Sequence, residues 1–171
     1  DSPDLDNDII KVMEEMISCF IDLTNEVPIV HLPAPYSLVA DIFGQEGLIM
    51  ALIEEPEFIQ TLLIHITRHI FVPWCNHFSK IFPNLLIEFS DASGSPDFIG
   101  PELFKNTAAL PILHLINNYS WGNRIFVSNY RGDAYPKNPD KNNTEGIPNS
   151  LAEIIDFKLK VCPFFIIKLE A

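Results

Sequence analysis

Polar side chains follow several apolar runs of this sequence, at the point where each run ends. Asp91 and Ser93 come soon after Asn84–Phe89, a run with the length and apolar content of a buried strand. A carboxylate placed there can accept a proton or orient a ligand, because α/β proteins bind ligands at the carboxyl ends of their strands. The alternative for Asp91 is structural, with its carboxylate capping the next turn through Ser93 or Ser95. The other polar residues at strand ends are Tyr36, Asn129, Arg131, Asp133 and Glu170.

Several of these residues have both a chemical and a structural interpretation. Arg131 can clamp an anionic ligand or pair with Asp133 in its own loop. Tyr36 can stack on a flat cofactor or simply pack in the core. Glu170 ends the last apolar run and can point into the same pocket. His31 lies within a strand, where an imidazole bonded to the backbone is the usual explanation.

The runs that carry these residues alternate with helical patterns. We expect strands at Val27–Leu32, Asn84–Phe89, Arg124–Ser128 and Phe164–Leu169. Helices are expected where apolar residues recur at helical spacing after a Pro or an N-capping residue. Their ranges are Asp8–Asn25, Ser37–Phe43, Gln45–Glu54, Glu55 to about Phe82 with a kink at Pro73, Leu103–Tyr119 and Ser150–Lys160. The turn-rich segment 134–148 is expected to be a mobile loop.

This order of elements predicts an α/β fold with parallel strands and right-handed crossovers, as one domain over residues 1–171. An open doubly wound sheet and part of a (β/α)8 barrel both fit the pattern. A whole barrel needs about 250 residues, so the chain is too short for one.

The chain is strongly acidic, with a net charge of −12 and a pI near 4.6. Phosphate binding needs clustered Lys and Arg, so nucleic acid is excluded as a partner, and an anionic membrane surface is disfavoured. No apolar run is long enough to span a bilayer, and the first residues lack the basic and apolar parts of a signal peptide. The cysteines, considered next, lead us to expect a cytoplasmic protein.

The cysteines and histidines do not form a metal-binding pattern. The three cysteines are far apart, odd in number and in apolar contexts, which predicts buried free thiols in a reducing compartment: Cys19, Cys75 and Cys162. His65 and His69 lie one helical turn apart, but the Glu of the H-E-x-x-H motif is absent. The sequence therefore predicts no metal site.

Three strand ends carry motifs that occur together in one protein family. The motifs are Ala34–Leu38 (APYSL), Phe89–Gly94 (FSDASG) followed by Gly100–Phe104 (GPELF), and Asn129–Asp133 (NYRGD). In their order and spacing they resemble the uroporphyrinogen decarboxylase superfamily, and Leu38–Gly44 with Glu54–Phe58 is closer to its corrinoid-dependent methyltransferases. The resemblance runs from about Pro28 onward. It implies part of a (β/α)8 barrel, about four strands from the middle and later half.

The resemblance implies methyl transfer between a methylcorrinoid, carried by a partner protein, and a small acceptor. Zinc-dependent members carry His-x-Cys-Gly where this chain has Asn129 and Arg131 before Gly132, and neither side chain is a plausible zinc ligand. The acceptor would then be activated by hydrogen bonding, without zinc. The catalytic residues implied are Asp91 and Asn129, and the binding residues are Tyr36, Asp41, Ser93, Arg131, Asp133 and Glu170.

Two alternatives remain open. One is uroporphyrinogen decarboxylase itself, an enzyme of porphyrin biosynthesis. The family's tyrosine and serine align with Asp41 and Asp91, so a polyanionic porphyrinogen would meet carboxylates instead of neutral donors, and we favour the methyltransferase over the carboxy-lyase. The other alternative is a non-catalytic binding or assembly fragment. A partial barrel exposes strand edges and an apolar flank, which predicts a homo-oligomer or a complementary barrel half as partner.

Overall fold

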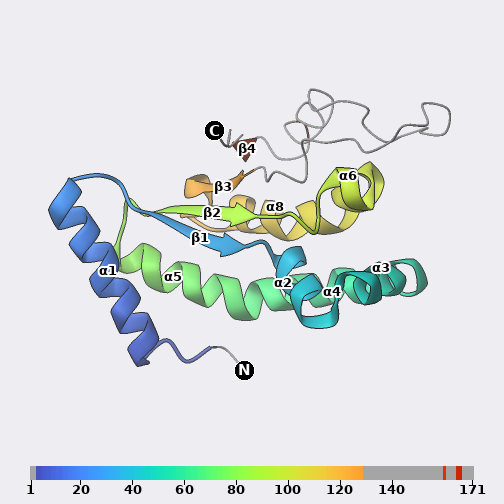
Figure 1. The fold of residues 1–171 in the computed structure, drawn as a ribbon, viewed down its shortest axis with the longest axis horizontal. Helices are drawn as coiled ribbons and strands as arrows, with labels where there is room; N and C mark the ends of the chain where they lie inside the picture. The colour runs from blue at the N-terminus through green and yellow to red at the C-terminus, as the bar shows by residue number, and fades with distance from the viewer. Residues whose placement is uncertain (1–2, 129–159, 161–164, 167–171) are drawn as a thin grey trace.

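The computed structural model describes residues 3–128, 160 and 165–166, and within them the chain forms an open α/β sheet (Figure 1). All neighbouring strands are parallel and follow the sequence order. The strands are β1 (Ile29–Pro33), β2 (Leu86–Ser90), β3 (Ile125–Ser128) and the two-residue β4 (Phe165–Ile166). The predicted α/β fold with parallel strands is confirmed. In the part of the chain described, the sheet does not close into a barrel.

The helices precede and connect the strands in the expected places. They are α1 (Asp8–Thr24), α2 (Pro35–Phe43), α3 (Gln45–Glu54), α4 (Pro56–Ile66), α5 (Val72–Ile81), α6 (Pro96–Ile99), α7 (Pro101–Leu103) and α8 (Ala109–Asn118). Three further turns are the π-helical η1 (Thr67–Phe71) and η2 (Phe104–Ala108) and the 3-10 turn η3 (Gly122–Arg124). The short helix α6, which follows the second strand, was not among the predicted elements. The predicted loop 134–148 and most of the predicted helix at 150–160 lie outside the described residues.

Local sequence explains the boundaries of these helices. The side chain of Asn7 accepts a hydrogen bond from the Ile10 N–H and caps α1. Gly44 separates α2 from α3 with a φ of 81°, a conformation that glycine adopts without strain. Pro35 and Pro56 lie in the first turns of α2 and α4, where a missing N–H costs nothing.

The long helix expected from Glu55 to about Phe82 runs through Pro73 by changing its hydrogen-bonding pattern. The π turn η1 directly precedes α5, and Pro73 lies in the first turn of α5. A proline lacks an N–H and crowds the carbonyl one turn back, so a wider turn before it relieves both conflicts. In the next long helix, η2 likewise precedes α8, which contains Pro111.

Three apolar clusters hold these elements together. One face of the sheet packs against η1, α5 and α8 through Phe89, Val127, Phe71 and Leu115. A second cluster joins α2, α3, α4 and the helices that follow β2 around Tyr36. A third packs α1 against α5 and the start of the second strand segment. Within the described residues no single helix could cross a membrane, although α2 and α3 pass the length and composition test together with a bend of 107° between them.

Candidate functional site

Asp91 lies one residue past β2 and joins the carboxyl ends of the two neighbouring strands β1 and β2. Its side chain is buried, with the residue 6% exposed, and its Oδ1 accepts hydrogen bonds from the Ser37 hydroxyl at 2.9 Å and the Gly94 N–H at 3.1 Å. Ser37 belongs to the first turn of α2, which begins just after β1. The positive end of the α2 dipole therefore lies near the carboxylate. The backbone closes the same junction, because the Ala34 N–H donates to the Ser90 carbonyl at 2.7 Å.

The loop after Asp91 is held tightly over the carboxylate. The Ser93 N–H donates to Ser37 Oγ at 3.3 Å, and Gln45 Nε2 of α3 donates to the Ser93 carbonyl at 3.1 Å. A Cβ on Gly94 would lie 2.5 Å from Asp91 Oδ2 and 2.8 Å from the Ala108 Cβ. Only glycine permits this approach. The carboxylate thus caps its own loop by accepting the Gly94 N–H, in keeping with the structural interpretation that Asp91 caps the turn after β2.

Tyr36 lies inside the second apolar cluster and is fully buried. Its hydroxyl has no hydrogen-bond partner among the residues that the structure describes. Burial, and secondarily the charge of Asp91, raise the pKa of Tyr36 to about 12. The ring therefore packs in the core, and the hydroxyl stays a neutral phenol.

The remaining predicted residues are placed differently. Ser93 is partly exposed beside Asp91, whereas Asp41 is exposed on α2, about one turn beyond Ser37. The structure thus brings Tyr36, Asp91 and Ser93 to one strand-end region and leaves Asp41 on the surface. Asn129, Arg131, Asp133 and Glu170 lie outside the described residues.

The sheet also has a polar face that the sequence reasoning missed. Glu88, at the centre of β2, is only 4% exposed, and its Oε1 lies 3.3 Å from Nδ1 of His31 on β1. The two residues are direct partners in the β1–β2 register. Ser90 and Ser128 are also register partners, two residues further along the same face. The sequence offered only a bond to the backbone for His31, and the structure places its ring beside a carboxylate. The sequence did contain one signal of this polar pair, because Glu88 is an acidic residue within an apolar strand pattern.

The structure also places most of the histidines and cysteines that the sequence singled out. No group of three or more His, Cys, Asp or Glu side chains is arranged to hold a metal ion in the described part of the chain. The His65 and His69 rings lie 4.2 Å apart on the surface. Cys75 is buried as expected, and burial raises its pKa to about 12. Cys19 is exposed, which corrects the prediction for that thiol, and Cys162 lies outside the described residues.

The chain was compared with family models, with curated proteins and with solved structures. No family model, no curated protein and no solved structure matches the chain. Its function is therefore argued from the strand-end residues and from the motifs that contain them.

Proposed function

We propose that this chain is the acceptor-binding part of a (β/α)-barrel methyltransferase of the uroporphyrinogen decarboxylase type. The observation that carries the proposal is the buried hydrogen bond from Ser37 to Asp91 across 54 residues of sequence. It joins two of the motifs on which the family resemblance rests, APYSL and FSDASG, at the carboxyl ends of adjacent parallel strands. Ligands of parallel α/β proteins bind at this edge of the sheet.

In this role Asp91 receives the proton of the acceptor. The methylcorrinoid, carried by a partner protein, is a substrate that supplies an electrophilic methyl group. An acceptor X–H forms the X–CH3 bond while the bond from the methyl carbon to cobalt breaks and leaves its electron pair on the corrinoid. The proton of X–H passes to the Asp91 carboxylate. Ser37 and the Gly94 N–H orient the carboxylate by donating to its Oδ1.

Methyl transfer from methylcobalamin to a thiol, a phenol and an amine tests this proposal. Loss of the methylcobalamin spectrum and mass spectrometry of the methylated acceptor report turnover. We expect the Asp91→Asn variant to lower the rate by about 100-fold or more, because it keeps an oxygen for Ser37 and Gly94 but cannot act as a base. Glu46→Gln, which changes an exposed carboxylate on α3, is the matched control and should leave the rate unchanged.

Three results would separate this proposal from the alternatives. Absence of turnover with all three acceptor classes contradicts the methyltransferase. Conversion of uroporphyrinogen to coproporphyrinogen assigns the carboxy-lyase branch instead. A non-catalytic role has support of its own, because one Asp91 oxygen already ties α2 to the loop after β2. If Asp91→Asn only lowers the melting temperature and the native chain binds no acceptor, that structural role is sufficient.

A further inference from the structure

Helix α1 has two apolar faces, and only one of them is covered. The inner face packs on the third apolar cluster through Ile10, Met13, Ile17 and Ile21. The outer face carries five large apolar side chains at helical spacing, which we call the outer stripe. Their exposed fractions are Ile9 75%, Val12 52%, Met16 67%, Phe20 43% and Leu23 80%. Such a continuous exposed stripe is typical of an interaction surface.

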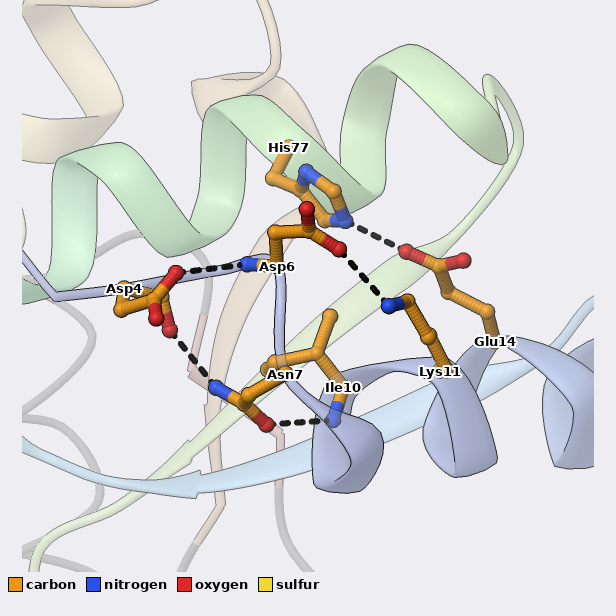
Figure 2. A network of polar contacts seen from close by, with 7 residues as sticks. All are labelled: Asp4, Asp6, Asn7, Ile10, Lys11, Glu14 and His77. Carbon is orange, nitrogen blue, oxygen red and sulfur yellow. Dashed lines mark hydrogen bonds and ion pairs between the residues drawn. The ribbon is translucent and has the colours of Figure 1, made fainter.

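The position of α1 is fixed by polar contacts, which are drawn in Figure 2. His77 of α5 lies 2.5 Å from Glu14, tying the two helices together. Asn7 caps the start of the helix, and Lys11 pairs with Asp6 at 2.8 Å. The outer stripe therefore belongs to an anchored helix. Figure 1 places α1 at the end of the molecule opposite α3 and α6, away from the strand ends that carry Asp91.

An acidic row runs beside the outer stripe. Asp8, Glu15 and Asp22 recur every seven residues, so they share one flank of the helix. Lys11 is the one basic residue in α1. Next to this row lies a groove of about 500 Å³, with Glu14, Glu15 and Asp22 on α1 and Ile81 and Phe82 at the end of α5. The groove combines carboxylates with apolar surface.

These features favour one kind of occupant. The outer stripe exposes on the order of 600 Å² of side-chain surface, close to the ~800 Å² that each partner contributes to a standard interface. A long basic side chain fits the groove, because its stem can lie on Ile81 and Phe82 while its charge reaches the carboxylates. A second copy of this chain carries a net charge of −12 and no basic row on its own α1, so charge disfavours self-pairing.

We propose that the outer face of α1 docks a basic amphipathic helix of another protein. Apolar residues of that helix cover the outer stripe, and its Lys or Arg side chains pair with the acidic row and enter the groove. This interface is independent of the methyl-transfer chemistry, because it lies at the other end of the molecule.

Two synthetic helical peptides with the same apolar heptad pattern test the proposal. One carries Lys at the flanking positions and the other carries Glu. By isothermal titration calorimetry we expect the Lys peptide to bind at least tenfold more tightly, and to lose affinity as salt is raised. The full chain is used throughout.

Variants on α1 locate the binding site. Met16→Glu places a charge at the centre of the outer stripe and should weaken binding of the Lys peptide at least tenfold. Met50→Glu is the matched control, because Met50 is a half-exposed methionine on α3 and lies outside the stripe. The double change Glu15→Lys with Asp22→Lys should reverse the preference toward the Glu peptide. Glu46→Lys with Glu54→Lys, on α3, should not.

Several outcomes would overturn the proposal. The proposal is wrong if the two peptides bind equally well, or if the Met16→Glu variant binds the Lys peptide as tightly as the native chain does. Sedimentation of the chain alone as a dimer that Met16→Glu dissociates assigns the stripe to a second copy. Binding to neutral phosphatidylcholine vesicles that is lost in Met16→Glu, with no peptide preference, assigns it to a lipid surface.

Discussion

The two faces of the sheet are both buried at their centre, but only one of them has an apolar centre. On the face that packs against α5 and α8, the central side chains are Ile87, Phe89 and Ile125. On the other face the central residue is Glu88, which lies beside the half-buried Phe126 and near Ser128. Glu88 and Ser128 are nearly as buried as the apolar residues of the first face. Burying polar groups costs free energy that apolar side chains do not cost. We infer that the helix-covered face supplies stability, whereas the polar face serves contacts that stability alone does not require.

The largest expected effect lies on the apolar face. Phe89→Ala should lower the free energy of unfolding by about 3–5 kcal/mol, because it leaves a cavity among Phe71 and the other side chains of that cluster. Urea denaturation of the variant and the native chain measures the difference. A loss below about 1 kcal/mol would show that this face does not supply the stability assigned to it.

The second prediction concerns Cys75, which lies in the same apolar cluster. Its folded pKa of about 12 is above the ordinary value of 9.0 because burial disfavours the thiolate. The resulting stabilisation is complete below pH 9 and is lost as the pH rises toward 12. In the Cys75→Ala variant, the free energy of unfolding should therefore fall less steeply with pH over this range. Denaturation at successive pH values measures this dependence.

Thiol labelling provides the control for that prediction. In a Cys162→Ser background, Cys19 should react rapidly with a thiol reagent and Cys75 only when the chain unfolds, because the first thiol is exposed and the second is buried. Rapid labelling of both thiols in the folded chain would contradict the burial of Cys75.

The smallest expected effect lies on the polar face. Glu88→Met replaces a buried carboxylate by an apolar side chain of similar size, while its neighbour His31 keeps access to water. The free energy of unfolding should stay the same or rise by up to about 2 kcal/mol. Denaturation under the same conditions as for Phe89→Ala gives a direct comparison. If Glu88→Met costs as much as Phe89→Ala, the two faces do not differ in the way proposed.

Local patterns predicted most of the helices and the presence of the strands. The cap at Asn7, the break at Gly44 and the prolines at helix starts depend on a few neighbouring residues, so the sequence contains that information directly. The boundaries of the strands were predicted less accurately. The second strand was expected at Asn84–Phe89 and is observed at Leu86–Ser90, because the ladder with β1 sets its ends.

The contacts that define the site depend on tertiary structure. Asp91 and Ser93 could be selected from their place after an apolar run, and Ser37 lies in the motif Ala34–Leu38 at another strand end. The hydrogen bond between Ser37 and Asp91 could not be predicted, because it requires β1 and β2 to be neighbours. The pairing of His31 with Glu88 likewise requires the strand register. Helical periodicity in α1 indicated an apolar surface without showing that half of it stays uncovered.

The π turn η1 has a consequence for how the molecule unfolds. Buried residues from α4 to α5 recur at intervals of four across η1, as in Ile59, Leu63, Thr67, Phe71 and Cys75. In a regular α-helix each interval of four drifts by about 40°, so the series would turn away from the core. The wider turn resets the phase, and one unbroken helix contributes to all three apolar clusters. We expect the three clusters to melt in a single transition, because none of them can loosen without disturbing the helix that they share.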